Sequence, residues 1–156
     1  MKRSFRFLRP GKLIDGDLEL VLVRTVEADP IKRYVPMYEF DMRHTARKWV
    51  MGQIRLRIGS AVALRYPGHI GYEVRPKFRG HRYAARSCLL LLPLARSHGL
   101  RGMWLTVDTK NIASQKTCDI IGAKFVETVR IPRNHEMFQE GVRYRRRYRL
   151  AVPPQE

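Results

Sequence analysis

The stretch VRPKFRGHRYAARSCLLLL, residues 74–92, decides the fold, because it leads from a strand through a basic loop into a helix. Arg75-Pro76 closes the strand-like segment 69–74, and from Arg82 onward the chain is rich in Ala and Leu, which favour a helix. Five cations with no acid among them occupy this region: Arg75, Lys77, Arg79, Arg82 and Arg86. Cations at a helix start oppose the positive end of its dipole. The pattern therefore indicates that an anion binds here, with a solvated basic helix start as the alternative.

The loop before this helix has the chemistry of an anion site. A strand–loop–helix connection leaves free backbone N–H groups at the helix start. Gly80 lets the backbone approach a ligand closely, and Arg79, His81 and Arg82 add positive charge. A pyrophosphate is a natural occupant. The sequence lacks GxGxxG and GxxxxGK(S/T), which argues against a Rossmann dinucleotide site and a P-loop.

The remaining pattern predicts a mixed α+β fold. Strands are expected at 18–25, 38–43, 49–58, 69–74, 103–108, 123–131 and 141–150, and helices at 82–98 and 111–121. Pro93 predicts a kink or break near Leu89, while Asn111 and Gly122 mark the start and the end of the second helix. The strand–helix–strand order in the middle implies one parallel pair. We therefore expect about seven mostly antiparallel strands around that pair, flanked by helices.

Length and charge bound the class of protein. The 156 residues suffice for one well-filled core, so we expect a single domain over 1–156 with a basic arm at 1–12. There are 31 Lys and Arg against 14 Asp and Glu, and 23 of these cations are Arg. This balance suggests an anionic partner such as nucleic acid, a phosphate ligand or a membrane surface, although an Arg-rich proteome would also produce it. No segment has the length of a membrane span and no signal-type stretch follows the N-terminus, so we expect a cytoplasmic protein without a membrane partner.

Two motifs resemble those of the GNAT N-acetyltransferase superfamily. Residues 74–92 resemble its motif A, and TVDTKNIASQKTCDIIGAKFVE, residues 106–127, is similar to its motif B. The matching positions are Arg79, Gly80 and Ala84 in motif A, and Asn111, Ser114 and Gly122 in motif B. The resemblance covers about residues 38–131. Either motif alone is weak, but the two together, in this order and at this spacing, are fairly specific.

The resemblance implies a GNAT-like fold with a splayed parallel strand pair and acetyl-CoA as co-substrate. Backbone N–H groups of the loop would hold the pyrophosphate, and the strand end at Val74 would pair with the pantetheine arm. The implied cofactor-binding residues are Val74, Arg79, Gly80, His81, Arg82, Tyr83, Ala84, Asn111 and Ser114. The reaction would be acetyl transfer to an amine of a small molecule or a protein, by a monomer or homodimer. The acceptor and the acyl chain length stay open.

Three departures from the family pattern bear on the site. Arg82 stands where many members have glycine, and Cys118 stands where many carry a Tyr that protonates the leaving thiolate. The usual helical region after the first strand is short here, at residues 26–37, and that region often shapes the acceptor pocket.

Attack on a thioester needs a free amine, so a base must take a proton from the ammonium form. Glu73 is the first candidate and His69 the second, and they share one face of the strand at 69–74. The alternative is that both are ordinary polar residues of an exposed sheet face. The other histidines have no metal-ligand spacing, so no metal is expected.

The last strand suggests a second class of function. Arg143, Arg145, Arg147 and Arg149 fall on one face of 141–150, with Tyr144 and Tyr148 on the other. Such an Arg ladder could contact nucleic acid. The protein would then be a non-catalytic binding module on a GNAT-like fold, or it would act on an RNA or ribosomal target. A charged edge strand that resists aggregation is the simpler interpretation.

Overall fold

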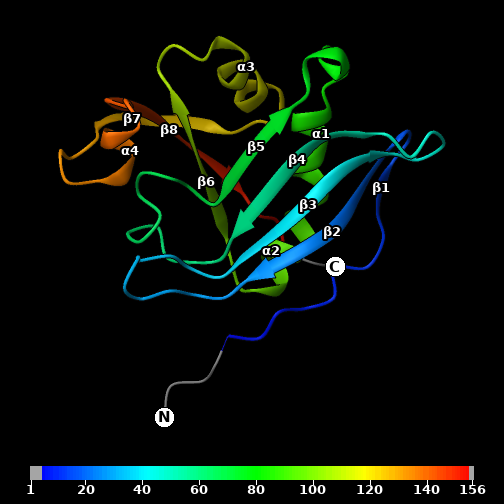
Figure 1. The fold of residues 1–156 in the computed structure, drawn as a ribbon, viewed down its shortest axis with the longest axis horizontal. Helices are drawn as coiled ribbons and strands as arrows, with labels where there is room; N and C mark the ends of the chain where they lie inside the picture. Colours follow the sequence, from blue (N-terminus) through cyan, green and yellow to red (C-terminus); the bar gives the residue numbers. More distant parts are fainter. Residues whose placement is uncertain (1–4, 155–156) are drawn as a thin grey trace.

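The structure is a computed structural model that describes residues 5–154, and its centre is an eight-stranded sheet (Figure 1). The strands are β1 (Leu13–Asp15), β2 (Leu18–Val26), β3 (Met37–His44), β4 (Val50–Arg57), β5 (Ile70–Val74), β6 (Gly102–Asp108), β7 (Lys124–Arg130) and β8 (Tyr144–Ala151). The helices are the 3₁₀-helix η1 (Pro76–Phe78) and the α-helices α1 (Tyr83–Leu90), α2 (Leu92–Ser97), α3 (Ile112–Ile120) and α4 (Glu136–Gln139). The strand order is β1-β2-β3-β4-β5-β6-β8-β7. The predicted mixed α+β class is confirmed, with eight strands instead of about seven.

The parallel pair in the middle of the sheet is splayed. The strands β5 and β6 run parallel and share a single registered pair, Ile70 with Leu105. Beyond that pair the two strands diverge toward their carboxyl ends (Figure 1). All other neighbouring strands pair antiparallel over longer stretches. The sheet therefore opens at one place, between the ends of β5 and β6.

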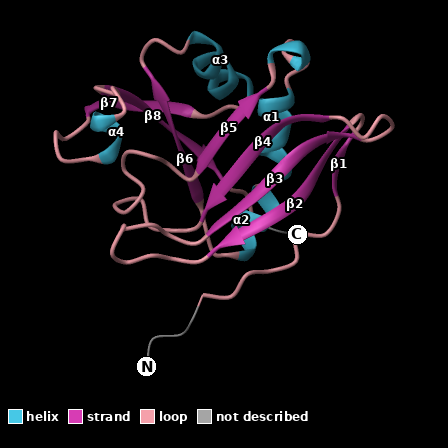
Figure 2. Cartoon of the chain, in the orientation of Figure 1, coloured by secondary structure: helices cyan, strands magenta, loops and turns pink. Residues whose placement is uncertain are grey.

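One face of the sheet carries the hydrophobic core. In β3 the buried Tyr38, Phe40 and Met42 alternate with the polar Glu39 and Asp41, as the period of a half-buried strand requires. Burying each such large apolar side chain contributes about 1.5–3 kcal/mol. The helices α1 and α2 cover this face, and no helix lies in front of β2, β3 and β4 in Figure 2. The other face of these strands is therefore free of helical cover.

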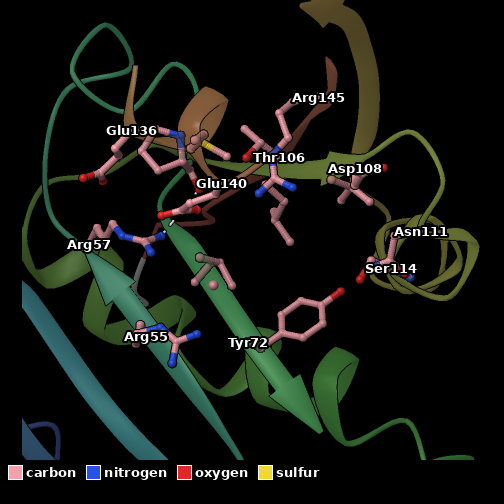
Figure 3. A pocket seen from close by; sticks show the side chains of 16 residues that line it. Arg55, Arg57, Tyr72, Thr106, Asp108, Asn111, Ser114, Glu136, Glu140 and Arg145 are labelled. Carbon is pink, nitrogen blue, oxygen red and sulfur yellow. Dashed lines mark hydrogen bonds between the residues drawn. The ribbon is translucent and has the colours of Figure 1, made fainter. Parts of the chain in front are cut away.

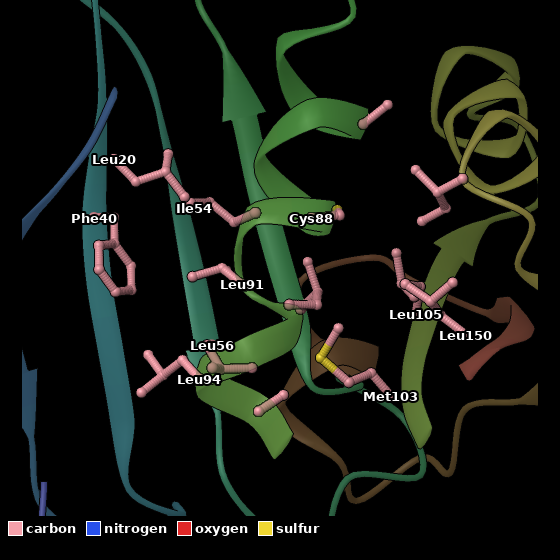
Figure 4. Packing of buried hydrophobic residues seen from close by; sticks show 14 of the residues in the cluster. Leu20, Phe40, Ile54, Leu56, Cys88, Leu91, Leu94, Met103, Leu105 and Leu150 are labelled. Carbon is pink, nitrogen blue, oxygen red and sulfur yellow. The ribbon is translucent and has the colours of Figure 1, made fainter. Parts of the chain in front are cut away.

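The helix break occurs where the sequence predicts it. The α1 helix ends at Leu90, α2 begins at Leu92, and Pro93 lies in the first turn of α2, where its missing N–H is not needed. Figure 4 shows Cys88, Leu91 and Leu94 packing on Ile54 and Leu56 of the sheet. The break thus lets two short helices follow the twisted sheet. Within residues 5–154, no helix has the length and apolar character needed to cross a membrane.

Aromatic contacts hold the described part of the predicted basic arm. The Phe7 ring meets Tyr38 edge-on at 5.1 Å between centroids, and Phe5 stacks on His98 at 4.9 Å. The backbone N–H of Leu8 donates to the hydroxyl of Tyr38 at 2.8 Å. Residues 1–4 of the arm lie outside the described residues.

The interpretation of 141–150 as an edge strand is wrong, because β8 lies between β6 and β7. The predicted alternation does hold, since Tyr148 and Leu150 are buried in the core while Arg145 and Arg147 point to the other face. Arg147 is buried, pairs with Glu127 at 2.8 Å and lies 4.1 Å from the centroid of the Trp104 ring. Part of the Arg ladder is therefore used within the fold.

Candidate functional site

The start of α1 is an uncapped helix end at the mouth of the splay. Its N-cap residue is Arg82, no side chain caps it, and its first turn contains no acid. The first helical backbone hydrogen bond of α1 runs from Arg86 N–H to the carbonyl of Arg82 at 2.9 Å. The N–H groups of Tyr83, Ala84 and Ala85 precede that bond and are the free donors that favour an anion.

The five cations around this helix start do not all serve the same purpose. Arg86 donates to the carboxylates of Asp15 and Asp17 at 2.7 Å each, so it ties α1 to the β1–β2 turn. Lys77 lies over the Trp49 ring. Among the residues that the structure describes, Arg75, Arg79 and Arg82 have no carboxylate within ion-pair distance. Those three guanidinium groups are available to a bound anion.

The predicted loop residues divide into surface and buried groups. Arg79, Gly80, His81 and Arg82 are exposed, and the His81 ring stacks on Tyr83 at 5.3 Å. Tyr83 and Ala84 are buried, and the Tyr83 hydroxyl donates to Asp17 at 2.6 Å. The side chains of Tyr83 and Ala84 thus belong to the core, so only their backbone N–H groups face a ligand. At the strand end, the Val74 carbonyl accepts from Arg79 Nε at 3.3 Å.

A pocket of about 390 Å³ fills the splay between β5 and β6 (Figure 3). Tyr72, Asn111 and Ser114 line the end near α3. Asp108 at the end of β6 lies beside Asn111 (Figure 3), and the rest of the charged lining comes from β4, from α4 with the residue that follows it, and from β8: Arg55, Arg57, Glu136, Glu140 and Arg145. The pocket therefore joins a polar end beside α3 to a strongly charged end beneath α4.

Asn111 caps α3 as the sequence predicts, since its Oδ1 accepts from Ser114 N–H at 3.1 Å. Both residues line the pocket. The structure therefore places Asn111 and Ser114 at the opening between β5 and β6. The 79–84 loop comes soon after β5 in the chain. Among residues 5–154, no cluster of three or more His, Cys, Asp or Glu side chains is arranged to hold a metal ion.

The fold thus combines a splayed parallel strand pair, a basic helix start and a pocket in the splay. Comparisons with known proteins show which family the chain belongs to. The sequence profile of the acetyltransferase (GNAT) family matches residues 19–122. The chain belongs to the GNAT acetyltransferase family. No curated protein sequence gives a significant match to this GNAT acetyltransferase.

Solved structures show the same fold at low sequence identity. An acetyltransferase from Agrobacterium tumefaciens has a TM-score of 0.62 at 17% identity, with 96% of this chain and 99% of that one covered. A GNAT acetyltransferase from Bacillus anthracis has a TM-score of 0.58 at 15% identity, covering 73% and 66%. The microcin C7 self-immunity acetyltransferase MccE, in complex with acetyl-CoA and AMP, has a TM-score of 0.57 at 16% identity, covering 74% and 61%. This chain thus spans less than two thirds of the latter two proteins.

Arg82 adopts a backbone conformation that usually favours glycine. Its φ is +60°, in the left-handed region, and Gly80 two residues earlier has φ +93°. A residue other than glycine in that region costs about 1–2 kcal/mol. A Cβ at Gly80 would meet no protein atom within 4 Å, so the backbone conformation and not a steric clash with the protein favours glycine there.

Tyr72 is a candidate that the sequence analysis missed. In the structure its hydroxyl is buried and points toward Ser114 on α3 (Figure 3), without a well-formed hydrogen bond to a described residue. Burial is the main cause that raises the pKa of Tyr72 to about 12, and the hydroxyls of Ser114 and Thr117 act in the opposite direction. Its alternation with Glu73 places Tyr72 on the core-facing side of β5, and this could have suggested it from the sequence. The family resemblance instead suggested a residue on α3 as the proton donor. The residue at the usual position, Cys118, is fully buried, and burial raises the pKa of its thiol to about 12.

The two predicted bases lie in very different surroundings. Glu73 is exposed, and both its carboxylate oxygens accept from Arg55, one of them at 2.9 Å. His69 is buried, its Nδ1 accepts from the Trp104 backbone N–H at 2.9 Å, and its Nε2 donates to the Gly59 carbonyl at 2.9 Å. Both ring nitrogens of His69 are thus engaged. Neither residue lines the pocket.

Proposed function

We propose that this GNAT acetyltransferase transfers an acetyl group from acetyl-CoA to an amine acceptor. The observation that carries the proposal is the pocket in the splay. Its charged lining suits a polar acceptor, and β5, which lines it, leads through Val74 to the uncapped basic helix start, which suits a pyrophosphate. The MccE structure, which shares the fold, was determined with acetyl-CoA bound.

In this proposal the cofactor runs from the α1 helix start into the splay. The N–H groups at the start of α1 would bind the pyrophosphate with the charges of Arg79 and Arg82. The pantetheine arm would follow the end of β5 at Val74 and pass Asn111 and Ser114 at the α3 end of the pocket. The thioester would then lie beside Tyr72, with the charged part of the pocket ahead of it.

The chemical step needs two proton movements. The amine nitrogen attacks the thioester carbonyl carbon, the C–S bond breaks, and the nitrogen gives up a proton. We place Tyr72 as the donor to the leaving thiolate, because it lines the pocket beside Ser114 and its pKa of about 12 keeps the hydroxyl protonated. We place Glu140 as the base. Of the three carboxylates that line the pocket, Asp108 accepts from Lys110 N–H and Glu136 from the Tyr34 hydroxyl. The Glu140 carboxylate has no hydrogen-bond partner among the described residues.

The nucleic-acid alternative has less support. The predicted ladder is interrupted, since Arg147 is buried against Glu127 and Arg145 lines the pocket. The net charge of +17 remains its only general argument. An anionic acetyl acceptor would explain part of that positive charge equally well, because it too needs cationic groups to bind it.

CoA should raise the melting temperature of the protein. A ligand at ~100 times its dissociation constant stabilises the folded state by ~2.7 kcal/mol. Pantetheine, which lacks the phosphates, should give a much smaller shift, because the helix start would have nothing to bind. Differential scanning fluorimetry with both compounds makes the comparison, and the absence of a shift at millimolar CoA would rule out the proposed function.

Replacing Tyr72 by Phe should lower kcat by about 10-fold and leave the CoA-induced shift in melting temperature unchanged. General acids typically contribute more, but a thiol of pKa ~8.5 is already a good leaving group near neutral pH. Release of CoA, followed with a thiol reagent, gives the rate. Tyr144→Phe, which removes an exposed hydroxyl, is the matched control. Equal kcat in both variants would remove Tyr72 from the mechanism.

A further inference from the structure

Two of the arginines that line the pocket make no ion pair with a carboxylate of the described residues. Arg57 comes from β4 and Arg145 from β8, on opposite sides of the splay, and both line the pocket (Figure 3). Ion pairs with carboxylates are made by Arg24, Arg43, Arg55, Arg65, Arg86 and Arg147. Within residues 5–154, neither Arg57 nor Arg145 makes one.

Their remaining contacts leave most of each guanidinium group unused. Among the described residues, Arg57 donates only to the backbone carbonyls of Pro67 and Gly68, at 3.5 and 3.3 Å. The Nε atom of Arg145 is buried without a hydrogen-bond partner among the described residues. A guanidinium carries five N–H donors and stays charged in proteins. Several donors in the pocket are thus free to bind an acceptor atom.

The two charges also act on each other. Burial is the main cause that lowers the pKa of both Arg57 and Arg145, and the pKa of Arg57 is lowered further by the neighbouring charges of Arg55 and Arg145. Glu136 acts in the opposite direction on Arg57, as Asp108 and Glu140 do on Arg145. The pocket therefore holds converging positive charges that repel one another, with carboxylates at longer range.

We infer that the acceptor of this enzyme is an amine that also carries an anionic group, a carboxylate or a phosphate, which Arg57 and Arg145 bind from the two sides of the splay. The opposite charges in the pocket fit such a zwitterion. Its ammonium group would face the carboxylates of Glu136, at the start of α4, and Glu140, just after its end, and its anionic group would face the arginines. This inference rests on the proposed function, since it names the acceptor class of the same site.

The anion site is tested first without turnover. In protein saturated with CoA, so that the α1 helix start is occupied, inorganic phosphate or acetate at tens of millimolar should raise the melting temperature by about 3 °C, as expected for a ligand at roughly ten times its dissociation constant. Arg145→Gln should abolish this rise, whereas Arg130→Gln, an exposed arginine on β7, should retain it. If neither anion shifts the melting temperature of the wild type, or if both variants respond alike, the inference is wrong.

Matched acceptors then separate the two sources of the anion. β-Alanine is compared with its amide, and O-phosphoethanolamine with ethanolamine, as acceptors or as competitors of an accepted amine. One anionic compound should exceed its neutral partner in kcat/KM or in inhibition by about 10- to 100-fold, the range for hydrogen bonds to charged groups. That ratio should fall toward one in Arg145→Gln and in Arg57→Gln. Equal ratios in wild type and both variants would overturn the anion site, whereas failure of CoA to bind would instead overturn the proposed function.

Discussion

Replacing Glu140 by Gln should lower kcat by about 100-fold at pH 7 and leave CoA binding unchanged. An amine with a pKa near ~10.4 is almost wholly protonated at neutral pH, and a positioned base typically contributes ~100- to 10,000-fold. Glutamine keeps the shape of the side chain but cannot take a proton. The loss should shrink as the pH rises toward 10, because free amine becomes abundant. Rates of CoA release between pH 6 and pH 10 measure this profile.

Glu73→Gln is the control for the Glu140 variant. Glu73 is held by Arg55 and does not line the pocket, so its replacement should change kcat by less than the Glu140 variant at every pH. If Glu73→Gln loses activity at pH 7 and recovers at high pH while Glu140→Gln does not, the base is Glu73. The melting temperature with CoA shows in each case whether the cofactor site is intact.

The long elements of the fold were predictable from local pattern alone. Each predicted strand and helix occurs within about three residues of its expected bounds, because alternation and helix caps are properties of short windows of sequence. The short elements β1, η1 and α4 were not predicted, since three or four residues do not complete a recognisable period. The position of β8 between β6 and β7 is a long-range pairing, which local pattern does not specify.

The two ends of the candidate site also differ in how far they could be predicted from local sequence pattern. The loop 79–84 and Asn111 lie on continuous motifs, so both could be proposed as candidates from the sequence alone. The charged end of the pocket is assembled from β4, β6, α4 and β8, four segments far apart in the chain. Arg57 resembled any outward-facing strand residue, Arg145 resembled one member of a ladder, and Glu140 lay between two predicted strands. Their convergence depends on the splay between β5 and β6.

His69 shows how one residue type can suggest catalysis and serve the fold. It bridges two segments, because it accepts from the backbone of β6 at Trp104 and donates to the backbone at Gly59. A histidine whose two ring nitrogens are both engaged in the interior has no free atom for a substrate proton. A structural role of His69 is therefore better supported than a catalytic one, and stability measurements can decide between the two roles.

Replacing His69 by Ala should lower the free energy of unfolding by about 3 kcal/mol. The variant leaves a buried N–H and a buried carbonyl without partners, at about 1–3 kcal/mol each, and it opens a small cavity. Burial lowers the pKa of His69, so the folded protein binds fewer protons than the unfolded chain. The wild type should therefore lose stability as the pH falls below ~6.5. His69→Ala lacks this loss, so the difference between the two should shrink in acid.

Urea unfolding at pH 8 and at pH 5 measures both effects. His81→Ala is the control. Because His81 is exposed, its replacement should change the free energy of unfolding by less than about 0.5 kcal/mol. Below the melting temperature of the variant, His69→Ala should keep kcat within a few-fold of the wild type. A variant with normal stability and a kcat that recovers at high pH would instead show that His69 takes the amine proton, and that its hydrogen bonds to Gly59 and Trp104 contribute little to folding.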